Sequence, residues 1–336
     1  MKKGLLALGA LFAICLSMLA TDMVVKQKNG EIVRFDVSEI NEVIFSESNP
    51  EDTTVVNASE TPLEFKIISD STVEVTGVNK DSESIEIPSK VKIDGKVYTV
   101  NSIKYSAFSW KRSLTTLEIP SSITSIAESS VFSGSSKLKS INVASDNPNY
   151  SSVDGVLYNK DKTKIICVPG GIRGDFTIPS SVNCIGYSAF ENDSLTSVKI
   201  PSSVTKIGIY AFCGCQIMKS IDIPASVTEI EDGAFARCSN MTNINIASDN
   251  PNFITVDGVL YNKDTTELIS VPAGIEGKFV VPSTVTSIRG MTIEQAKELL
   301  LDPVFYGMMM VKKEEADGLV SGAAHSTADT LRPALQ

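Results

Sequence analysis

The sequence predicts a mainly β fold in which short repeats stack into a solenoid, with a β-hairpin before it and a short α/β segment after it. The first observation is a segment of the form Ile-Pro-x-Ser-Val that recurs every 22 to 23 residues, at Pro179, Pro201 and Pro224. The second is an Ala-Phe pair that follows each segment at the same spacing, with its rings at Phe190, Phe212 and Phe235. The third is a longer stretch, Ile141 to Pro179, that recurs 103 residues later as Ile244 to Pro282. A duplicated block of several coils, each block with a hairpin-like insert, accounts for both periods.

Each repeat has the apolar spacing of a leucine-rich repeat, as in Leu195, Val198, Ile200, Val204 and Ile207. Before each proline, alternation is typical of a short strand with one buried face, with Ile221 and Ile223 inward and Ser220 and Asp222 outward. Proline has no N–H to donate, so it ends the strand. One unit cannot bury its apolar residues alone, so the stacked coils must share a core. The Ala-Phe pairs, and Phe132 after Val131 in one further repeat, predict a column of rings in that core, at Phe108, Phe132, Phe190, Phe212 and Phe235.

The outward strand positions are small and polar, with charges of both signs. They are Thr116, Glu118, Ser197, Lys199, Ser220, Asp222, Asn243 and Asn245. Such a grid suits a broad protein interface, but a solvated strand face has the same composition, so both interpretations stay open. The aromatic residues of the inserts are alternative contact sites, although packing of the hairpins onto the coils is favoured for them; they are Tyr150, Tyr158, Phe253 and Tyr261.

The N-terminal residues predict export. Two lysines precede an apolar stretch from Gly4 to Leu19, which is typical of a secretory signal peptide, here residues 1–20. Residues 21–46 contain two short apolar segments around an Asn-Gly turn, which indicates a β-hairpin. Residues 47–60 are polar and predict a linker. Strands at 63–68 and 73–75 then begin the repeat domain, residues 61–289, as its N-terminal cap.

Charge and cysteine usage limit the function classes. A net charge of -10 and a pI near 4.8 argue against a nucleic-acid partner, because phosphate binding needs clustered Lys and Arg. Beyond the signal the cysteines are odd in number and lack a metal-binding spacing, so neither a complete disulfide framework nor a metal is expected. Cys215 and Cys238 each lie three residues after a repeat Phe, which predicts stacked inward thiols, with a disulfide as the alternative. The run from Asp154 to Thr163 hints at calcium but lacks the spacing of a known loop, so it is interpreted as turns.

The units of the form Ile-Pro-Ser-Ser-Val-Thr-x-Ile-x-x-x-Ala-Phe resemble the BspA-like leucine-rich repeats of surface and secreted proteins from anaerobic, often gut or oral, bacteria. The resemblance covers about residues 63–288, with several copies in register. It implies a leucine-rich-repeat solenoid without catalysis that binds a host or bacterial surface protein. The hairpin of residues 21–46 also resembles the short segment that often follows the signal in such proteins.

The pattern changes after Ile288. A capping box at Thr292 and Gln295 begins a helical pattern that continues to Asp302, and a strand is expected at 308–311. Residues 291–336 resemble phosphate acetyltransferase, which exchanges acetyl groups between coenzyme A and phosphate. The resemblance implies that four positions correspond to that enzyme's active-site cleft: Ser321, Ser326, Thr327 and Arg332, the last as a coenzyme A or phosphate contact.

This tail is expected to be inert. The catalytic Ser, Arg and Asp residues from the rest of that enzyme have no counterpart in the chain, and no catalytic constellation can be assembled around His325. We therefore predict that residues 290–336 are a vestigial fragment in a chimeric reading frame. The prediction for the whole chain is an exported, non-catalytic module for protein binding or adhesion, without a cofactor and with no transmembrane segment after signal removal. Phosphate acetyltransferase activity and a purely structural surface-layer role are the alternatives.

Overall fold

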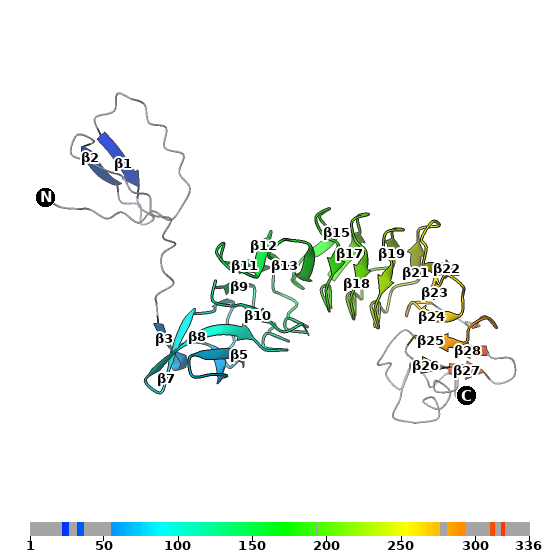
Figure 1. Cartoon of the computed structure of the whole chain (residues 1–336), viewed down its shortest axis with the longest axis horizontal. Coiled ribbons are helices and arrows are strands. Elements are labelled where there is room, and N and C mark those ends of the chain that lie inside the picture. Colours follow the sequence, from blue (N-terminus) through cyan, green and yellow to red (C-terminus); the bar gives the residue numbers. More distant parts are fainter. Residues whose placement is uncertain are drawn as a thin grey trace. The chain divides into compact units, whose positions relative to one another are not determined.

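The computed structural model describes residues 22–26, 32–36 and 55–289 without 129, 192–193 and 276–280, and three short strands at 291–292, 310–312 and 317–319. It divides into two compact units, Met1–Thr53 and Thr54–Gln336 (Figure 1). In the first unit, β1 (Asp22–Lys26) pairs antiparallel with β2 (Ile32–Asp36), where the sequence predicts a hairpin. The predicted signal peptide lies outside the described residues.

The second unit begins with a mixed sheet that runs β3-β7-β8-β5-β4. Its strands are β3 (Val55–Asn57), β4 (Leu63–Ile67), β5 (Thr72–Val78), β7 (Lys90–Ile93) and β8 (Lys96–Ile103), and η2 (Ala58–Glu60) is a 3-10 turn. The strands predicted at 63–68 and 73–75 are confirmed as β4 and β5. The prediction of a linker through residue 60 is wrong for its last six residues, because β3 pairs in parallel with β7.

The coils contribute two sets of short parallel strands. The first set carries the outward polar positions and consists of the strands before the repeat prolines together with β11 and β21, which precede the inserts. Its strands are β6 (Ser84–Glu86), β9 (Thr116–Ile119) and β11 (Ser140–Val143), then β15 (Arg173–Thr177) with β17 (Ser194–Lys199), and β19 (Ser220–Ile223) with β21 (Asn243–Ile246). The second set follows the prolines: β10 (Ser125–Ile126), β16 (Cys184–Ile185), β18 (Lys206–Ile207) and β20 (Glu229–Ile230). Between the sets, the proline carbonyl accepts a turn hydrogen bond, as from the N–H of Val204 to Pro201 at 3.1 Å. This arrangement confirms a solenoid of stacked coils.

Each duplicated block carries a three-stranded insert. The first consists of β12 (Tyr150–Val153), β13 (Val156–Asn159) and β14 (Lys164–Cys167), and the second of β22 (Phe253–Val256), β23 (Val259–Asn262) and β24 (Glu267–Ser270). In both inserts the third strand pairs in parallel with a coil strand, β14 with β16 and β24 with β25 (Ser287–Ile288). The inserts therefore replace part of a coil and keep the stack continuous.

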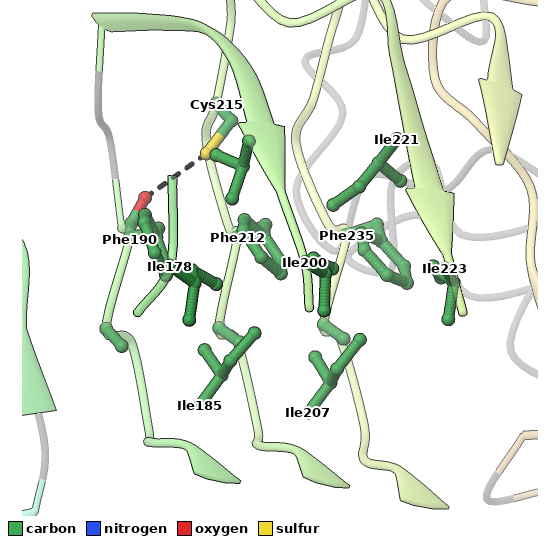
Figure 2. Packing of buried hydrophobic residues seen from close by; sticks show 14 of the residues in the cluster. Ile178, Ile185, Phe190, Ile200, Ile207, Phe212, Cys215, Ile221, Ile223 and Phe235 are labelled. Carbon is green, nitrogen blue, oxygen red and sulfur yellow. Dashed lines mark hydrogen bonds between the residues drawn. The ribbon is translucent and has the colours of Figure 1, made fainter. Parts of the chain in front are cut away.

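A column of phenylalanine rings runs through the stacked coils. Phe190, Phe212 and Phe235 lie in a row, and Ile185 and Ile207 form a second row beside it (Figure 2). Ring centroids are 4.8 Å apart for Phe190 and Phe212 and 5.7 Å apart for Phe212 and Phe235, and the rings are nearly parallel. A second pair stacks nearer the N-terminus, Phe108 on Phe132 at 6.0 Å. The predicted column is thus confirmed as two separate stacks.

The last coil is recognisable to β25, which supports the prediction that the repeat pattern continues to Ile288. β26 (Met291–Thr292) pairs antiparallel with β25, and β27 (Met310–Lys312) with β28 (Asp317–Leu319). Thr292, predicted to cap a helix, belongs to β26, and the expected helical segment 293–302 lies outside the described residues.

Candidate functional site

The outward positions of the first strand set form a polar face. Ser197, Lys199, Ser220, Asp222, Asn243 and Asn245 are exposed, whereas Thr116 and Glu118 are partly buried. In β19 and β21 the inward isoleucines between them are buried, as the alternation predicts. The structure places the eight residues in three small sheets: one pair on β9, one on β17, and two on β19 and β21.

Hydrogen bonds between neighbouring coils brace this face. The amide nitrogen of Asn245 donates to Asp222 Oδ1 at 2.8 Å, and that of Asn142 donates to Glu118 Oε1 at 2.7 Å. The hydroxyls of Thr196 and Ser197 donate to Asp175 Oδ1 at 2.8 and 2.7 Å. Because they favour the charged form, these two bonds lower the pKa of Asp175.

Asp175 and Asn142 were missed by the sequence reasoning, although register provides the signal for both. Asp175 lies directly opposite Ser197 in the β15/β17 ladder, and Asn142 lies opposite Glu118 in the β9/β11 ladder. Asp175 lies one coil before the outward position of Ser197, and Asn142 lies one coil after that of Glu118. Both could have been identified by continuing the list of outward positions to these neighbouring coils. The face therefore has a fixed array of donors and acceptors whose side chains are held in place before any partner arrives.

The second strand set carries charged pairs. Lys206 Nζ lies 2.8 Å from Glu229 Oε1 and 2.6 Å from Glu231 Oε1, and these two carboxylates raise the pKa of Lys206. The carboxylate of Glu231 also accepts from the N–H of Ile209 at 3.1 Å, and its own pKa is lowered chiefly by Lys206. Such exposed pairs contribute little to stability individually.

The aromatic residues of the inserts serve packing. Tyr158, Tyr261 and Phe253 are buried, and burial raises the pKa of Tyr261 to about 12. Tyr150 is half-buried, and its hydroxyl accepts a hydrogen bond from the N–H of Ile126 at 2.8 Å. The favoured interpretation, in which the hairpins pack onto the coils, is the one that the structure supports.

The polar motifs of the inserts are structural. The Asn147 side chain is fully buried, and it donates to the carbonyls of Pro120 and Ile123, both at 2.9 Å, while its oxygen accepts from the N–H groups of Asn149 and Tyr150. Asp154 and Gly155 both have positive φ, 50° and 80°, and form the tight turn of the hairpin. Within the described residues no cluster of His, Cys, Asp and Glu is suited to hold a metal ion. In the run from Asp154 to Thr163, turns at Asp154–Gly155 and Lys160–Asp161 flank strand β13.

A cavity of about 170 Å³ lies where the first insert meets the coils on either side of it. Phe132, Val131 and Ile166 contribute apolar walls, and Ser130, Lys164 and Glu191 contribute polar ones. Lys164 Nζ forms an ion pair with Glu128 Oε1 at 2.7 Å, and the hydroxyl of Ser130 donates to Glu191 Oε2 at 3.2 Å. No sequence pattern indicated this site.

The five cysteines of the repeat region are thiols in the structure. Cys215 Sγ donates to the carbonyl of Phe190 at 3.2 Å (Figure 2), and Cys238 Sγ donates to that of Phe212 at 3.0 Å. Both thiols are fully buried and point inward, as predicted from their register. Burial also raises the pKa of Cys213 to about 12, which makes this thiol a poor nucleophile at neutral pH.

The four positions that correspond to an acetyltransferase cleft lie outside the described residues: Ser321, Ser326, Thr327 and Arg332. His325 lies outside them as well. In the described part of the chain, no helix is long and apolar enough to cross a membrane.

The tail is similar to phosphate acetyltransferases. The family model described as "Phosphate acetyl/butaryl transferase" matches residues 283–336. The enzyme of Acetivibrio thermocellus is 69% identical over 48 residues, which are 14% of this chain and 14% of the enzyme. That of Bacillus subtilis is 69% identical over 45 residues, 13% of this chain and 14% of the enzyme. The chain thus spans about one seventh of the length of each of these two enzymes.

The repeat region is similar to solved leucine-rich-repeat structures, each aligned over 68% of this chain. A leucine-rich repeat protein from Eubacterium ventriosum is 18% identical, with 82% of that chain covered and a TM-score of 0.40. A leucine rich cell surface protein from Faecalibacterium prausnitzii is 25% identical, with 71% covered and a TM-score of 0.39. A leucine-rich repeat protein from Bacteroides ovatus is 23% identical, with 60% covered and a TM-score of 0.37.

The family assignment rests on the repeats. The model of the "BspA type Leucine rich repeat region" matches in six copies over residues 79–173 and 174–276, which is more than half of the chain. Each range contains one three-stranded insert, β12 to β14 in the first and β22 to β24 in the second. The chain belongs to the BspA-type leucine-rich-repeat family and carries a phosphate acetyltransferase-like segment at its C-terminal end.

Proposed function

We propose that this chain is an exported, non-catalytic module that binds a protein on a host or bacterial surface through the polar face of its first strand set. The observation that carries the proposal is the braced array of side chains on that face. Asp175, Asp222 and Glu118 are each held by a donor from a neighbouring coil, so little side-chain freedom is lost on binding.

Composition supports the same proposal. Along a strand of this face a small exposed side chain lies beside a charged one, as with Ser220 and Asp222 in β19, where the residue between them is buried. A face of this kind suits a broad contact in which many polar groups are matched across the interface. Adhesion is the form of binding that we infer from export of a surface module of this family.

The test compares two triple-arginine variants of the full chain. Ser197→Arg, Ser220→Arg and Asn243→Arg cover the polar face, whereas Ser202→Arg, Gln216→Arg and Ser239→Arg place the same charge on exposed turns. Binding to immobilised plasma and extracellular-matrix proteins is measured by surface plasmon resonance. We expect the face variant to weaken binding at least about tenfold and the turn variant to leave it unchanged. Equal loss in both variants, or no saturable binding by the parent chain, would contradict the proposal.

A second candidate is phosphate acetyltransferase activity, favoured by the match of residues 283–336. We infer that the chain lacks it, because the matched part covers only 14% of the Acetivibrio enzyme. An assay that follows coenzyme A release from acetyl-CoA and phosphate tests this. Turnover above that of an Arg332→Ala variant would contradict the inference.

A further inference from the structure

The cavity beside the first insert lies at an interruption of the phenylalanine column. Phe212 has a ring on each side, at 4.8 and 5.7 Å, whereas Phe132 has one ring neighbour among the described residues, Phe108. The other four column rings are buried to 1% exposure or less, but Phe132 is only partly buried and lines the cavity. The next coil, built by the insert, has no Ala-Phe pair. The cavity therefore lies where the stack of rings would otherwise continue.

Its size and walls suit an aromatic ring. A cavity of about 170 Å³ is slightly larger than apolar cavities of about 150 Å³ that hold benzene. The walls formed by Phe132, Val131 and Ile166 offer an apolar surface, and an added ring could stack on Phe132 as its neighbours do in the closed column.

The polar side of the cavity has an excess of negative charge. Glu128 is paired with Lys164, whereas Glu191 accepts a hydrogen bond from the Ser130 hydroxyl and, among the described residues, forms no ion pair. A cationic group that enters beside the ring would find this carboxylate within a partly enclosed site, where a charge-assisted hydrogen bond is stronger than in open water.

The second block shows how the chain itself fills the corresponding place. The parallel ladders align Ile288 with Leu268 and Ile185 with Ile165, so Arg289 occupies the position that Gly186 occupies beside the cavity. Arg289 Nη1 donates to the carbonyl of Ile230 at 2.9 Å, and its Nε lies 3.0 Å from Glu267 Oε1. A basic side chain thus lies over the coil edge in the second block, whereas the first block has a glycine there, with the Cε of Lys164 3.1 Å from the place where a Cβ would stand.

We propose that this cavity receives an aromatic side chain next to a basic one on the partner polypeptide. The inference rests on the proposed protein-binding function and adds a contact site separate from the polar face. The ring would extend the stack beyond Phe132, and the basic group would pair with Glu191.

The test uses three acetylated, amidated tetrapeptides, Gly-Phe-Arg-Gly, Gly-Ala-Arg-Gly and Gly-Phe-Gln-Gly, with the full chain. Binding is followed by ligand-observed NMR titration. We expect millimolar binding of the Phe-Arg peptide, at least about tenfold weaker binding of the Ala-Arg peptide, and an intermediate loss for the Phe-Gln peptide. Equal binding of the first two peptides, or no binding of any, overturns the proposal. If benzylamine binds as tightly as the Phe-Arg peptide, the site is one for a small amine, and the proposal of a polypeptide ligand is overturned.

Variants locate the site. Gly170→Leu narrows the cavity and should abolish binding of the Phe-Arg peptide, whereas Ala273→Leu, at the equivalent position of the second insert, should not affect it. Glu191→Gln should weaken binding severalfold without disturbing the core, which keeps the test valid if Gly170→Leu does not fold. Unchanged binding in Glu191→Gln and in a folded Gly170→Leu overturns the proposal.

The two proposals fail separately. A surface-protein partner that loses affinity with the triple-arginine face variant but not with Gly170→Leu supports the polar face and overturns the cavity. Peptide binding that depends on the cavity, in a chain that binds no surface protein, leaves the cavity in place and contradicts the proposed function.

Discussion

The two repeated stretches, residues 141–179 and 244–282, each contain one insert. They share the hydrogen bonds of a buried asparagine and differ at the positions that line the cavity in the first stretch. Asn147 and Asn250 are buried in both and make the same four hydrogen bonds. The positions that line the cavity in the first insert include four that are changed in the second: Tyr150 to Phe, Lys164 to Glu, Cys167 to Ser and Gly170 to Ala. A side chain that satisfies buried backbone groups is retained in both copies of a duplicated segment. Side chains that line a cavity can differ between the copies, because each cavity only has to fit its own occupant.

The largest effect is expected at the buried asparagines. Asn147→Ala leaves two carbonyls and two N–H groups of neighbouring segments without partners, and we expect it to lower the free energy of unfolding by about 3 kcal/mol. Asn250→Ala should cost the same within error, because its bonds are equivalent. Thermal and urea unfolding followed by circular dichroism measure both. If only one of the two variants lowers the free energy of unfolding, the hydrogen bonds of the two asparagines do not contribute equally to stability.

The hairpin turns provide a second comparison. Gly155 and Gly258 have φ of 80° and 82°, and an added Cβ would lie 2.8 Å from the carbonyl oxygens of Lys139 and Thr242. Each Gly→Ala change should therefore cost about 2 kcal/mol, from left-handed strain plus the displaced backbone. Gly95→Ala is the matched control, since its φ is 84° but nothing lies within 4 Å, and it should cost about 1 kcal/mol. If all three variants unfold at the same denaturant concentration, the close backbone approach contributes nothing.

A smaller effect separates Tyr150 from Phe253. Tyr150→Phe removes the acceptor for the N–H of Ile126 and should cost about 1 kcal/mol. The reverse change, Phe253→Tyr, adds a hydroxyl to a ring that is 6% exposed, and we expect it to destabilise the chain as well, because that hydroxyl must find a partner. Denaturant unfolding of the two single variants measures this. A stabilised Phe253→Tyr variant would show that the second insert can accept the first one's arrangement.

The sequence predicted the features that recur in every coil, but it did not predict the features that arise where the repeat is interrupted. The spacing of prolines and Ala-Phe pairs was sufficient for the ring column, the inward thiols of Cys215 and Cys238, and the alternating outward face. The cavity was not predictable in this way, because it exists where a coil lacks the Ala-Phe pair and depends on how the insert fills the space. β3 was missed because two valines in a polar run carry little signal until β7 provides a partner strand. The buried role of Asn147 and Asn250 had a signal, a polar motif retained in both copies, that was not used.

The smallest effect concerns the charge of Asp175 on the polar face, a position at which the second copy of the repeated stretch has Lys278 in the sequence. Hydrogen bonds from Ser197 and Thr196 lower the pKa of Asp175 in the folded chain, so this group adds stability above its unfolded-state pKa, and the contribution is lost as the pH falls through the folded-state pKa. NMR titration of the carboxyl carbon should show a midpoint below 3.8 that rises in Ser197→Ala. Asp175→Asn should remove this part of the acid dependence, together with the small stabilisation that the ionised carboxylate contributes at neutral pH. A midpoint that does not respond to Ser197→Ala would mean that the bracing bonds of the polar face are absent in solution.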